Sequence, residues 1–398
     1  MVISPTVSED SVEKNCPYFP ACGGCDWIGQ DYQQQLTWKN NYCQNLFGCF
    51  NIKKQDGVIA SPEIYYYRNK MDFVITDNKG KLAIGLRTKG NFNKIVPIEE
   101  CKIFMPNLKE ITEPILSWAG EEGFTTYNSR THRGQLRYLC LRHAKTTGEV
   151  MAVLVMALDE KDFKQQQNKF QRLTRIIRDK NIIDSFYICF NTGKADISLT
   201  DKLYLVFGKP YLKEILNGIV YYLSPNTFLQ SNTFCCSLLY ELICRVSQCD
   251  NRSVLDLFCG SGGISLQLAL KAKEVLGVDN SPSNVTLAKE NAAFNKLTNV
   301  SFICTDANEF MKRSEPINYD ILVLDPPRMQ LSKDFVNILT NCKIQRIIYV
   351  SCNPYNAYYD LKQLTTSYYL EQVIPVDMFV HTRHLEVILV LSRQALSG

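Results

Sequence analysis

A short apolar segment followed by three glycines places the strongest constraint on how this chain can fold. Residues 254–258 form an apolar run containing one acid, which is typical of a buried strand. Gly260, Gly262 and Gly263 follow directly, and residues 264–272 have helical spacing. Glycines at such a turn let the backbone bend tightly and come close to a ligand. The order strand, glycine turn, helix therefore predicts a nucleotide-type site at the carboxyl edge of a parallel sheet.

The chain beyond this turn keeps alternating strand-like and helix-like segments, which predicts a doubly wound α/β sheet. The predicted strands cover residues 274–278, 299–304, 319–324, 346–350, 369–378 and 386–392. Three acids, Asp279, Asp306 and Asp325, follow the first three of these strands. Because parallel strands end at the same edge, we expect the three carboxylates beside one ligand, with Asp279 placed to hold ribose hydroxyls.

Length and composition exclude several classes of protein. A chain of 398 residues is too long for one ordinary domain, so two or three are expected. It has no apolar run of about 18 residues, so no membrane partner is expected. Residues 1–15 are polar and lack the apolar core of a secretion signal, which favours a cytoplasmic location. Sixteen scattered cysteines then fit reduced thiols better than disulfides.

Three of these cysteines stand close together near the start of the chain. Cys16, Cys22 and Cys25 lie within ten residues, with glycines that let the loop fold back on itself. A fourth ligand must come from elsewhere, and Cys101, just after a strand-like stretch, is our candidate. Two other cysteines compete for that place: Cys43 and Cys49. Four thiolates suit zinc or an iron–sulfur cluster, and the alternative is a set of inert buried thiols.

Residues 50–215 are predicted to form an antiparallel sheet with flanking helices. Residues 65–98 alternate apolar and polar side chains around an Asn-Lys-Gly turn at 78–80, which is a hairpin signal. Residues 162–180 are predicted as one helix, and residues 182–197 as strands.

Positive charge is concentrated in the same region. Residues 64–98 and 130–145 each carry a net charge of +5, although the whole chain carries only +4. Basic strands with interspersed tyrosines suit RNA, whose unpaired bases stack on aromatic rings. The alternatives are a solvated sheet face for the charges and a core role for the tyrosines.

Two further places combine a reactive side chain with a position at the ligand-binding edge. Cys352 follows the predicted strand 346–350, in the phrase Ser-Cys-Asn-Pro, where a thiol is placed as a nucleophile. Glu386 is the first residue of an otherwise apolar predicted strand, where a carboxylate is unexpected unless it has a specific role. The alternatives are an inert thiol at Cys352, and a rim ion pair at Glu386 or a zinc site formed by the preceding His381 and His384.

Several phrases, in this order along the chain, resemble one known family. Asp-x-Phe-x-Gly-x-Gly at 256–262 resembles motif I of the S-adenosylmethionine-dependent methyltransferases. The cysteine pattern, Phe-x-Gln-x-Asn at 228–232, Asp-Pro-Pro-Arg at 325–328, Ser-Cys-Asn-Pro at 351–354 and His-x-x-His-x-Glu at 381–386 resemble the RNA uracil-5 methyltransferases. The short segment before Cys16 is similar to the 23S ribosomal RNA members without an N-terminal RNA-binding barrel. The phrase at 228–232 also has a simpler interpretation, with Asn232 as a helix cap.

The resemblance implies a site and its cofactors. Cys352 would be the nucleophile and Glu386 the general base. S-adenosylmethionine would be bound by Gln230, Phe258, Gly260, Gly263, Asp279, Asp306 and Asp325. A [4Fe–4S] cluster would be held by Cys16, Cys22, Cys25 and Cys101. The family usually has a threonine and an arginine shortly after the nucleophile, and here Asn356 and Tyr359 take those places.

The resemblance also implies an organisation and a substrate. Residues 1–50 would be an iron–sulfur segment, 51–215 a central α+β RNA-binding domain, and 216–398 a Rossmann-like methyltransferase domain. The expected protein is a cytoplasmic monomer that methylates carbon 5 of a uridine, in ribosomal RNA rather than transfer RNA. The alternatives are a transfer RNA uracil-5 enzyme, a cytosine-5 RNA methyltransferase, and a non-enzymatic iron–sulfur RNA-binding protein.

Overall fold

The computed structural model describes residues 16–200, 202–313 and 318–394, so the predicted absence of a secretion signal at residues 1–15 lies outside the described residues. The chain divides into two compact units, each described here by itself. The first contains the described residues of Met1–Gly29, Glu63–Glu214 and Tyr222–Asn226, and the second those of Gln30–Pro62, Ile215–Tyr221 and Thr227–Gly398. Residues 30–62 therefore pack with the C-terminal half of the chain rather than with the cysteine-rich segment.

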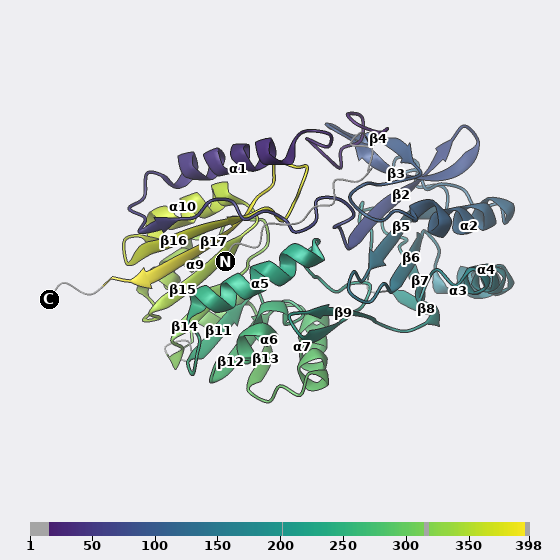
Figure 1. Cartoon of the computed structure of the whole chain (residues 1–398). Coiled ribbons are helices and arrows are strands. Elements are labelled where there is room, and N and C mark those ends of the chain that lie inside the picture. Colours follow the sequence, from purple (N-terminus) through teal and green to yellow (C-terminus); the bar gives the residue numbers. More distant parts are fainter. Residues whose placement is uncertain (1–15, 201, 314–317, 395–398) are drawn as a thin grey trace. The chain divides into compact units, whose positions relative to one another are not determined.

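The first unit is built on a seven-stranded sheet with the order β4-β3-β2-β5-β6-β7-β8 (Figure 1). Its elements are β2 (Lys70–Asn78), β3 (Lys81–Thr88), β4 (Asn91–Ile98), α2 (Leu108–Glu121), β5 (Leu136–His143), β6 (Val150–Met156), α3 (Glu160–Gln165), α4 (Gln167–Lys180), β7 (Ser185–Phe190) and β8 (Leu203–Gly208). The predicted hairpin is confirmed: β2 and β3 pair across a two-residue turn in which Lys79 and Gly80 both have positive φ, at 55° and 82°. Helices α2, α3 and α4 bury Trp118, Phe163 and Phe170 in one core with the sheet.

Three predictions for this unit are wrong in detail. The sheet is not purely antiparallel, because β6 and β7 pair in parallel across the α3–α4 crossover. The predicted helix is broken at Gln166, a position without a helix-breaking residue. Of residues 182–197, only β7 is a strand. The carbonyls of Asn191, Gly193 and Ala195 instead accept hydrogen bonds from the buried Arg137 guanidinium, at 2.9, 2.5 and 2.6 Å. These backbone groups are therefore satisfied without pairing to a neighbouring strand.

The second unit contains an eight-stranded sheet with the order β1-β16-β17-β15-β14-β11-β12-β13. Its elements are α1 (Tyr32–Phe47), β1 (Lys54–Gln55), α5 (Thr233–Ser247), β11 (Ser253–Leu257), α6 (Gly263–Ala269), β12 (Glu274–Asp279), α7 (Pro282–Phe294), β13 (Val300–Cys304), α8 (Ala307–Met311), β14 (Ile321–Leu324), α9 (Lys333–Asn341), β15 (Arg346–Ser351), α10 (Pro354–Leu364), β16 (Tyr368–Val376) and β17 (Glu386–Arg393). All predicted strands of this region are confirmed to within a few residues. Only β17 runs antiparallel, inserted between β15 and β16.

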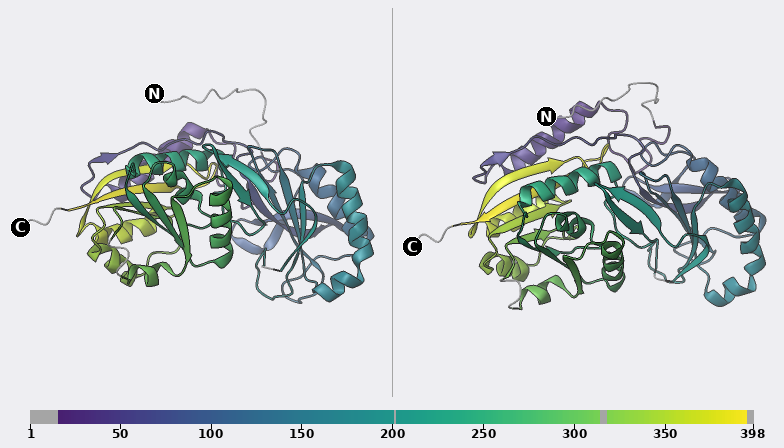
Figure 2. Two further views of the ribbon diagram at one scale, coloured as in Figure 1. Left: turned by 90° about the horizontal axis from the view of Figure 1, so that it is seen from below. Right: turned by 60° about the horizontal axis from the view of Figure 1, so that its bottom comes forward.

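Helices cover both faces of this sheet, as a doubly wound fold requires. Helices α1, α8, α9 and α10 share one core with alternate strand residues, while α5, α6 and α7 contact the opposite face (Figures 1 and 2). Residues 1–50 were expected to form one iron–sulfur segment, but helix α1 of this range packs beside α10 in the second unit. Strand β1 pairs with β16 and extends the sheet, although residues 51–215 were predicted to form the central domain.

A separate hairpin joins β9 (Leu212–Leu216) and β10 (Ile219–Leu223) through a turn at Asn217 and Gly218, which have φ of 50° and 84°. Among the helices formed by the described residues, none has the length and apolar character needed to cross a bilayer.

Candidate active site

The glycine turn after β11 has the strained backbone that only particular residues adopt. Phe258, Gly260 and Gly262 have φ of 63°, 55° and 86°. A Cβ atom on Gly263 would lie 2.2 Å from the Tyr240 hydroxyl, so this glycine is required by packing. A Cβ on Gly260 would meet no atom within 4 Å. The turn is therefore closed on the helix side and open at Gly260, where a ligand can approach the backbone.

Asp279 ends β12 directly beside this turn. Its carboxylate accepts hydrogen bonds from Gly260 N at 3.0 Å, Ser281 N at 2.9 Å and the Asn284 amide at 3.2 Å. The carboxylate thus connects the glycine turn to the loop after β12. It is half-buried, so part of it stays accessible to a ligand.

The other two strand-end acids differ in their surroundings. Asp306 is exposed and caps α8, accepting from Asn308 N at 2.9 Å and Glu309 N at 3.2 Å. Asp325 follows β14 and accepts a hydrogen bond of 3.2 Å from the buried Gln230 amide. Burial raises the pKa of Asp325 to about 7. The sequence phrases that contain Gln230 and Asp325, far apart in the chain, therefore meet at one point.

Asp256 was noticed in the sequence but given no role. It is fully buried in β11, accepts a 2.5 Å hydrogen bond from Ser265 Oγ, and its pKa is raised to about 7 by burial. Because Ser265 belongs to α6, this bond fastens the helix to the strand on either side of the glycine turn.

The two predicted catalytic residues are brought together by the antiparallel pairing of β15 and β17. The last pair in this ladder is Ser351 with Val387. One step further along each strand stand Cys352 and Glu386, so their side chains belong to the same end of the sheet. Cys352 is half-buried, whereas Glu386 is fully buried.

Glu386 is a carboxyl group held out of water. Neither carboxylate oxygen has a hydrogen-bond partner among the described residues. Burial raises the pKa of Glu386 well above the usual value, the neighbouring Asp325 adds to this, and Arg328 opposes it. Glu386 is fully buried, and its oxygens have no hydrogen-bond partner among the described residues, so the interpretation as an ion pair at the rim is not supported.

Arg328 is a site residue that the sequence prediction left out of the site. Burial raises the pKa of the Cys352 thiol to about 11, with a further contribution from Glu386. The Arg328 guanidinium acts in the opposite direction on both Cys352 and Glu386. The sequence feature that could have identified Arg328 is its position directly after the Pro-Pro turn, at the same edge of the sheet as the strand-end acids.

A second group of residues that the prediction missed fixes the loop before Glu386. Lys39 on α1 forms a buried ion pair with Asp377. The Gln35 side chain bonds the His381 ring at 3.1 Å and accepts from His381 N at 3.0 Å. The loop that carries His381 is thus held by α1.

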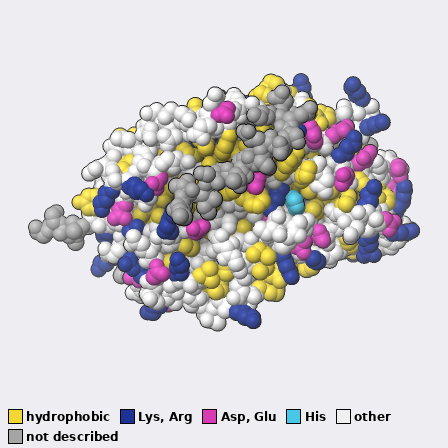
Figure 3. Space-filling model, in the orientation of Figure 1, with side chains coloured by type: hydrophobic (Ala, Val, Ile, Leu, Met, Phe, Trp, Pro, Cys, Tyr) yellow, Lys and Arg dark blue, Asp and Glu magenta, His cyan; other side chains and the backbone are white. Residues whose placement is uncertain are grey.

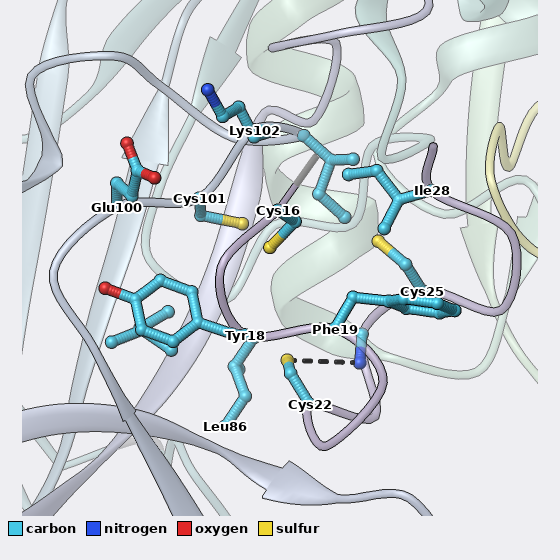
Figure 4. A pocket seen from close by; sticks show the side chains of 13 residues that line it. Cys16, Tyr18, Phe19, Cys22, Cys25, Ile28, Leu86, Glu100, Cys101 and Lys102 are labelled. Atoms are coloured by element: carbon cyan, nitrogen blue, oxygen red, sulfur yellow. Dashed lines mark hydrogen bonds between the residues drawn. The ribbon is translucent and has the colours of Figure 1, made fainter. Parts of the chain in front are cut away.

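The four predicted metal ligands line one pocket of the first unit (Figure 4). Cys22 Sγ accepts a hydrogen bond of 3.4 Å from Gly24 N. Burial raises the pKa of Cys101 to about 11, and the neighbouring thiol of Cys22 contributes. The rival Cys43 is buried in the core of the second unit, and Cys49 is exposed.

Within the described part of the chain, no group of His, Cys, Asp or Glu side chains has the arrangement of a metal-ion site. The four thiols share a pocket with apolar walls that include Phe19, Ile28 and Leu86. Gly23 allows the loop to lie against the β3 backbone, because a Cβ there would be 2.8 Å from Arg87 O.

Fewer cations of the first unit face solvent freely than the segment charges suggested. Arg137 and Arg142 are buried, and Arg87 and Lys89 pair with Asp196 and Asp26. On the face drawn in Figure 3, Lys and Arg side chains are mixed with Asp and Glu side chains.

The sheet order, the glycine turn and the strand-end acids define a Rossmann-like methyltransferase. The family model described as tRNA (Uracil-5-)-methyltransferase matches residues 31–394, and the chain belongs to this family. It is an S-adenosylmethionine-dependent RNA uracil-5 methyltransferase.

Relatives and a solved structure agree with this assignment. An uncharacterized RNA methyltransferase of Caldanaerobacter subterraneus is 32% identical over 392 residues, covering 96% of this chain and 85% of that protein. The tRNA (uracil(54)-C(5))-methyltransferase of Pyrococcus furiosus is 31% identical, covering 95% and 84%. The crystal structure of Pyrococcus abyssi tRNA (uracil-54, C5)-methyltransferase with S-adenosyl-L-homocysteine has a TM-score of 0.77 and 29% identity, covering 94% and 86%.

Proposed function

We propose that Cys352 is the nucleophile and Glu386 the general base of methyl transfer to carbon 5 of a uridine in RNA. The first candidate substrate is ribosomal RNA. The observation that carries this proposal is the placement of Cys352 and Glu386 one step beyond the last β15–β17 pair, with Arg328 acting on both.

Carbon 5 of uracil is a poor nucleophile, and a thiolate solves this problem. The Cys352 sulfur adds to carbon 6, and the electron pair of the carbon 5–carbon 6 double bond moves into the enolate. S-adenosylmethionine, when bound, supplies the electrophilic methyl group that carbon 5 attacks. Glu386 then accepts the carbon 5 proton, the double bond re-forms, and the thiolate leaves.

The surroundings of the two residues fit these roles. A buried carboxylate without a hydrogen-bond partner is a stronger base than a solvated one, because water does not stabilise its charged form. The Arg328 cation stabilises the Cys352 thiolate at the moment of attack. The target base must leave its stack to reach both groups.

The cofactor is assigned to the edge that includes the open position at Gly260. Asp279 would bind the ribose hydroxyls, while Gln230 and Asp325 would lie toward the reacting end. Phe258 and Gly263 shape the turn, and Asp306 is assigned to the adenine amine. The open space at Gly260 supports this assignment.

Ribosomal RNA is the first candidate substrate because the four-cysteine pattern resembles the 23S ribosomal RNA members of the family. Transfer RNA is the second candidate, favoured by the Pyrococcus furiosus relative, which is named for uracil-54 of transfer RNA. Purified protein should be incubated with unmodified ribosomal RNA and, separately, transfer RNA, together with labelled S-adenosylmethionine. Mass spectrometry of the digested RNA then locates 5-methyluridine. Product in transfer RNA alone would overturn the ribosomal assignment, and 5-methylcytidine would overturn the proposed chemistry.

We also propose that Cys16, Cys22, Cys25 and Cys101 hold a [4Fe–4S] cluster. The four thiols line one pocket, and four cysteine thiolates are the usual ligands of a [4Fe–4S] centre. Anaerobically purified protein should be brown, with about four irons per chain and matching sulfide. One zinc per chain and no sulfide would refute the cluster.

A further inference from the structure

An aromatic surface lies on helices α1 and α10, and the proposed chemistry gives it no role. Tyr355 and Tyr359 on α10 are 52% and 40% exposed, although large aromatic side chains are mostly buried. Trp38 on α1 is 43% exposed and stacks on Tyr42, with ring centroids 5.5 Å apart and an interplanar angle of 6°. We call these four residues the aromatic surface.

The four rings lie near one another because α1 packs against α10 (Figure 1). Burial raises the pKa of Tyr42, and the nearby Tyr355 adds to the effect. The Tyr355 and Tyr359 hydroxyls are 2.9 Å apart, with their ring centroids 5.0 Å apart. Tyr358 beneath them packs edge-on against Phe50 at 5.6 Å. The rings are therefore held in place before any partner arrives, which lowers the entropy cost of binding.

The charges around the aromatic surface favour an anionic partner. The exposed Lys362 amine lies 5.3 Å from the Tyr359 ring centroid and 4.5 Å from that of Tyr358. Helix α1 contains no acidic residue, and the one acid of α10, Asp360, is buried and accepts from the Tyr349 hydroxyl at 2.7 Å. Exposed rings with a cation and no neighbouring carboxylate on these helices suit single-stranded nucleic acid.

The surface also begins next to the reacting groups. Helix α10 starts at Pro354, two residues after Cys352. At a rise of about 1.5 Å per residue within the helix, Tyr355 and Tyr359 stand roughly 1.5 and 7.5 Å beyond Pro354. This span matches about one to three nucleotides stacked at roughly 3.4 Å. A uridine that leaves its stack deprives its neighbours of a stacking partner, and exposed rings on the helix that follows Cys352 can supply one.

We propose that the aromatic surface binds the unpaired bases that flank the target uridine, stacking them on Tyr355 and Tyr359 while Lys362 contacts a phosphate. This inference rests on the proposed function and adds to it a requirement for single-stranded RNA beside the target.

Binding of a fluorescein-labelled oligouridine of about nine nucleotides tests the proposal. The measurement uses a Cys352→Ala background, so that no covalent adduct forms. Tyr355→Ala should weaken binding about tenfold, whereas Tyr355→Phe, which keeps the ring, should bind normally. With the same RNA made abasic on both sides of the central uridine, Tyr355→Ala should cause no further loss. Tyr369→Ala on β16, a matched exposed tyrosine outside the surface, should have no effect.

An equal loss on intact and abasic RNA, or no loss on either, would overturn the stacking role. A Tyr355-dependent dimer in sedimentation experiments would show that the surface contacts a second copy of the chain instead. Methylation assays with Cys352 intact distinguish a failure of this inference from a failure of the proposed function. If the native chain makes 5-methyluridine while Tyr355→Ala keeps its KM for RNA, only this inference fails. If the native chain makes no such product, the proposed function fails.

Discussion

Lys39 Nζ lies 2.5 Å from Asp377 Oδ1, and neither side chain is exposed to solvent. Lys39 also donates to Phe379 O at 3.1 Å. The pair joins a helix near the start of the chain to the segment that leads into Glu386 near its end. The position of Glu386, the proposed general base, therefore depends on Lys39, which lies 338 positions before Asp377 in the chain.

The first prediction concerns this ion pair. Lys39→Met should lower the free energy of unfolding by about 3 to 5 kcal/mol, because it leaves the Asp377 carboxylate buried without its cation. Urea denaturation followed by tryptophan fluorescence measures the loss. Adding Asp377→Asn should recover part of it, since no unpaired charge then remains. A loss below about 1 kcal/mol for the single variant would show that water reaches Asp377.

The Lys39–Asp377 pair also shows what sequence analysis can and cannot reach. Lys39 shares a helical stripe with Gln35, Cys43 and Phe47, all buried, and a charged residue in such a stripe is a readable sign of a buried partner. The identity of that partner was not readable, because nothing local in the sequence connects residues so far apart. For the same reason the residues of α1 were assigned to the iron–sulfur segment 1–50.

The methyltransferase sheet was predictable because its strands are short apolar runs, several of which have a candidate site residue at the carboxyl end. Cys352 and Asp279 follow this rule, whereas Glu386 reaches the same edge as the first residue of the antiparallel strand β17. Arg328 was harder to place, since its effect on Cys352 and Glu386 depends on the way two strands and a Pro-Pro turn converge. The parallel β6–β7 pairing was missed because strands buried on both sides lack an alternating pattern.

The second prediction concerns two glycines of one turn. Gly263→Ala should cost about 1 to 3 kcal/mol in stability, because its Cβ would lie 2.2 Å from the Tyr240 hydroxyl. Tyr240→Phe in the same chain should recover part of this loss. Gly260→Ala meets no atom within 4 Å, but its φ of 55° should cost about 1 kcal/mol in stability, and the folded variant should also bind S-adenosylhomocysteine more weakly in calorimetry. Equal affinity of native and Gly260→Ala protein would contradict the assignment of the open position to the cofactor.

The third prediction concerns the binding of the cofactor ribose by Asp279. Asp279→Ala should weaken S-adenosylhomocysteine binding by about 1 to 3 kcal/mol, the usual result when a buried polar group loses its partner. Asp306→Ala is the matched comparison, because Asp306 is exposed and the loss there should be smaller. Calorimetry on both variants gives the ranking, and a reversed order would move the ribose contact away from Asp279.

The fourth prediction concerns pH. Only the Cys352 thiolate attacks, and burial raises the pKa of this thiol to about 11, so the rate of adduct formation should rise from about pH 7 to about pH 10. Arg328 lowers that pKa, so Arg328→Gln should move the profile to higher pH, while Arg328→Lys, which keeps the charge, should move it less. Rates of trapping on 5-fluorouridine RNA give the profile. A shift to lower pH on removing the arginine would contradict this role.

The fifth prediction separates Cys352 from Glu386 by the step at which each acts. Cys352→Ala should form no covalent RNA adduct and no product. Glu386→Gln should still add to the base and transfer the methyl group, and then stop, because no group accepts the carbon 5 proton. It should therefore accumulate a denaturation-resistant protein–RNA complex that carries labelled methyl. RNA with 5-fluorouridine should trap the native chain in the same state, since fluorine does not leave as a proton does. On a denaturing gel, a retarded labelled band from Cys352→Ala would place the nucleophile elsewhere, and full turnover by Glu386→Gln would remove the carboxylate from the mechanism.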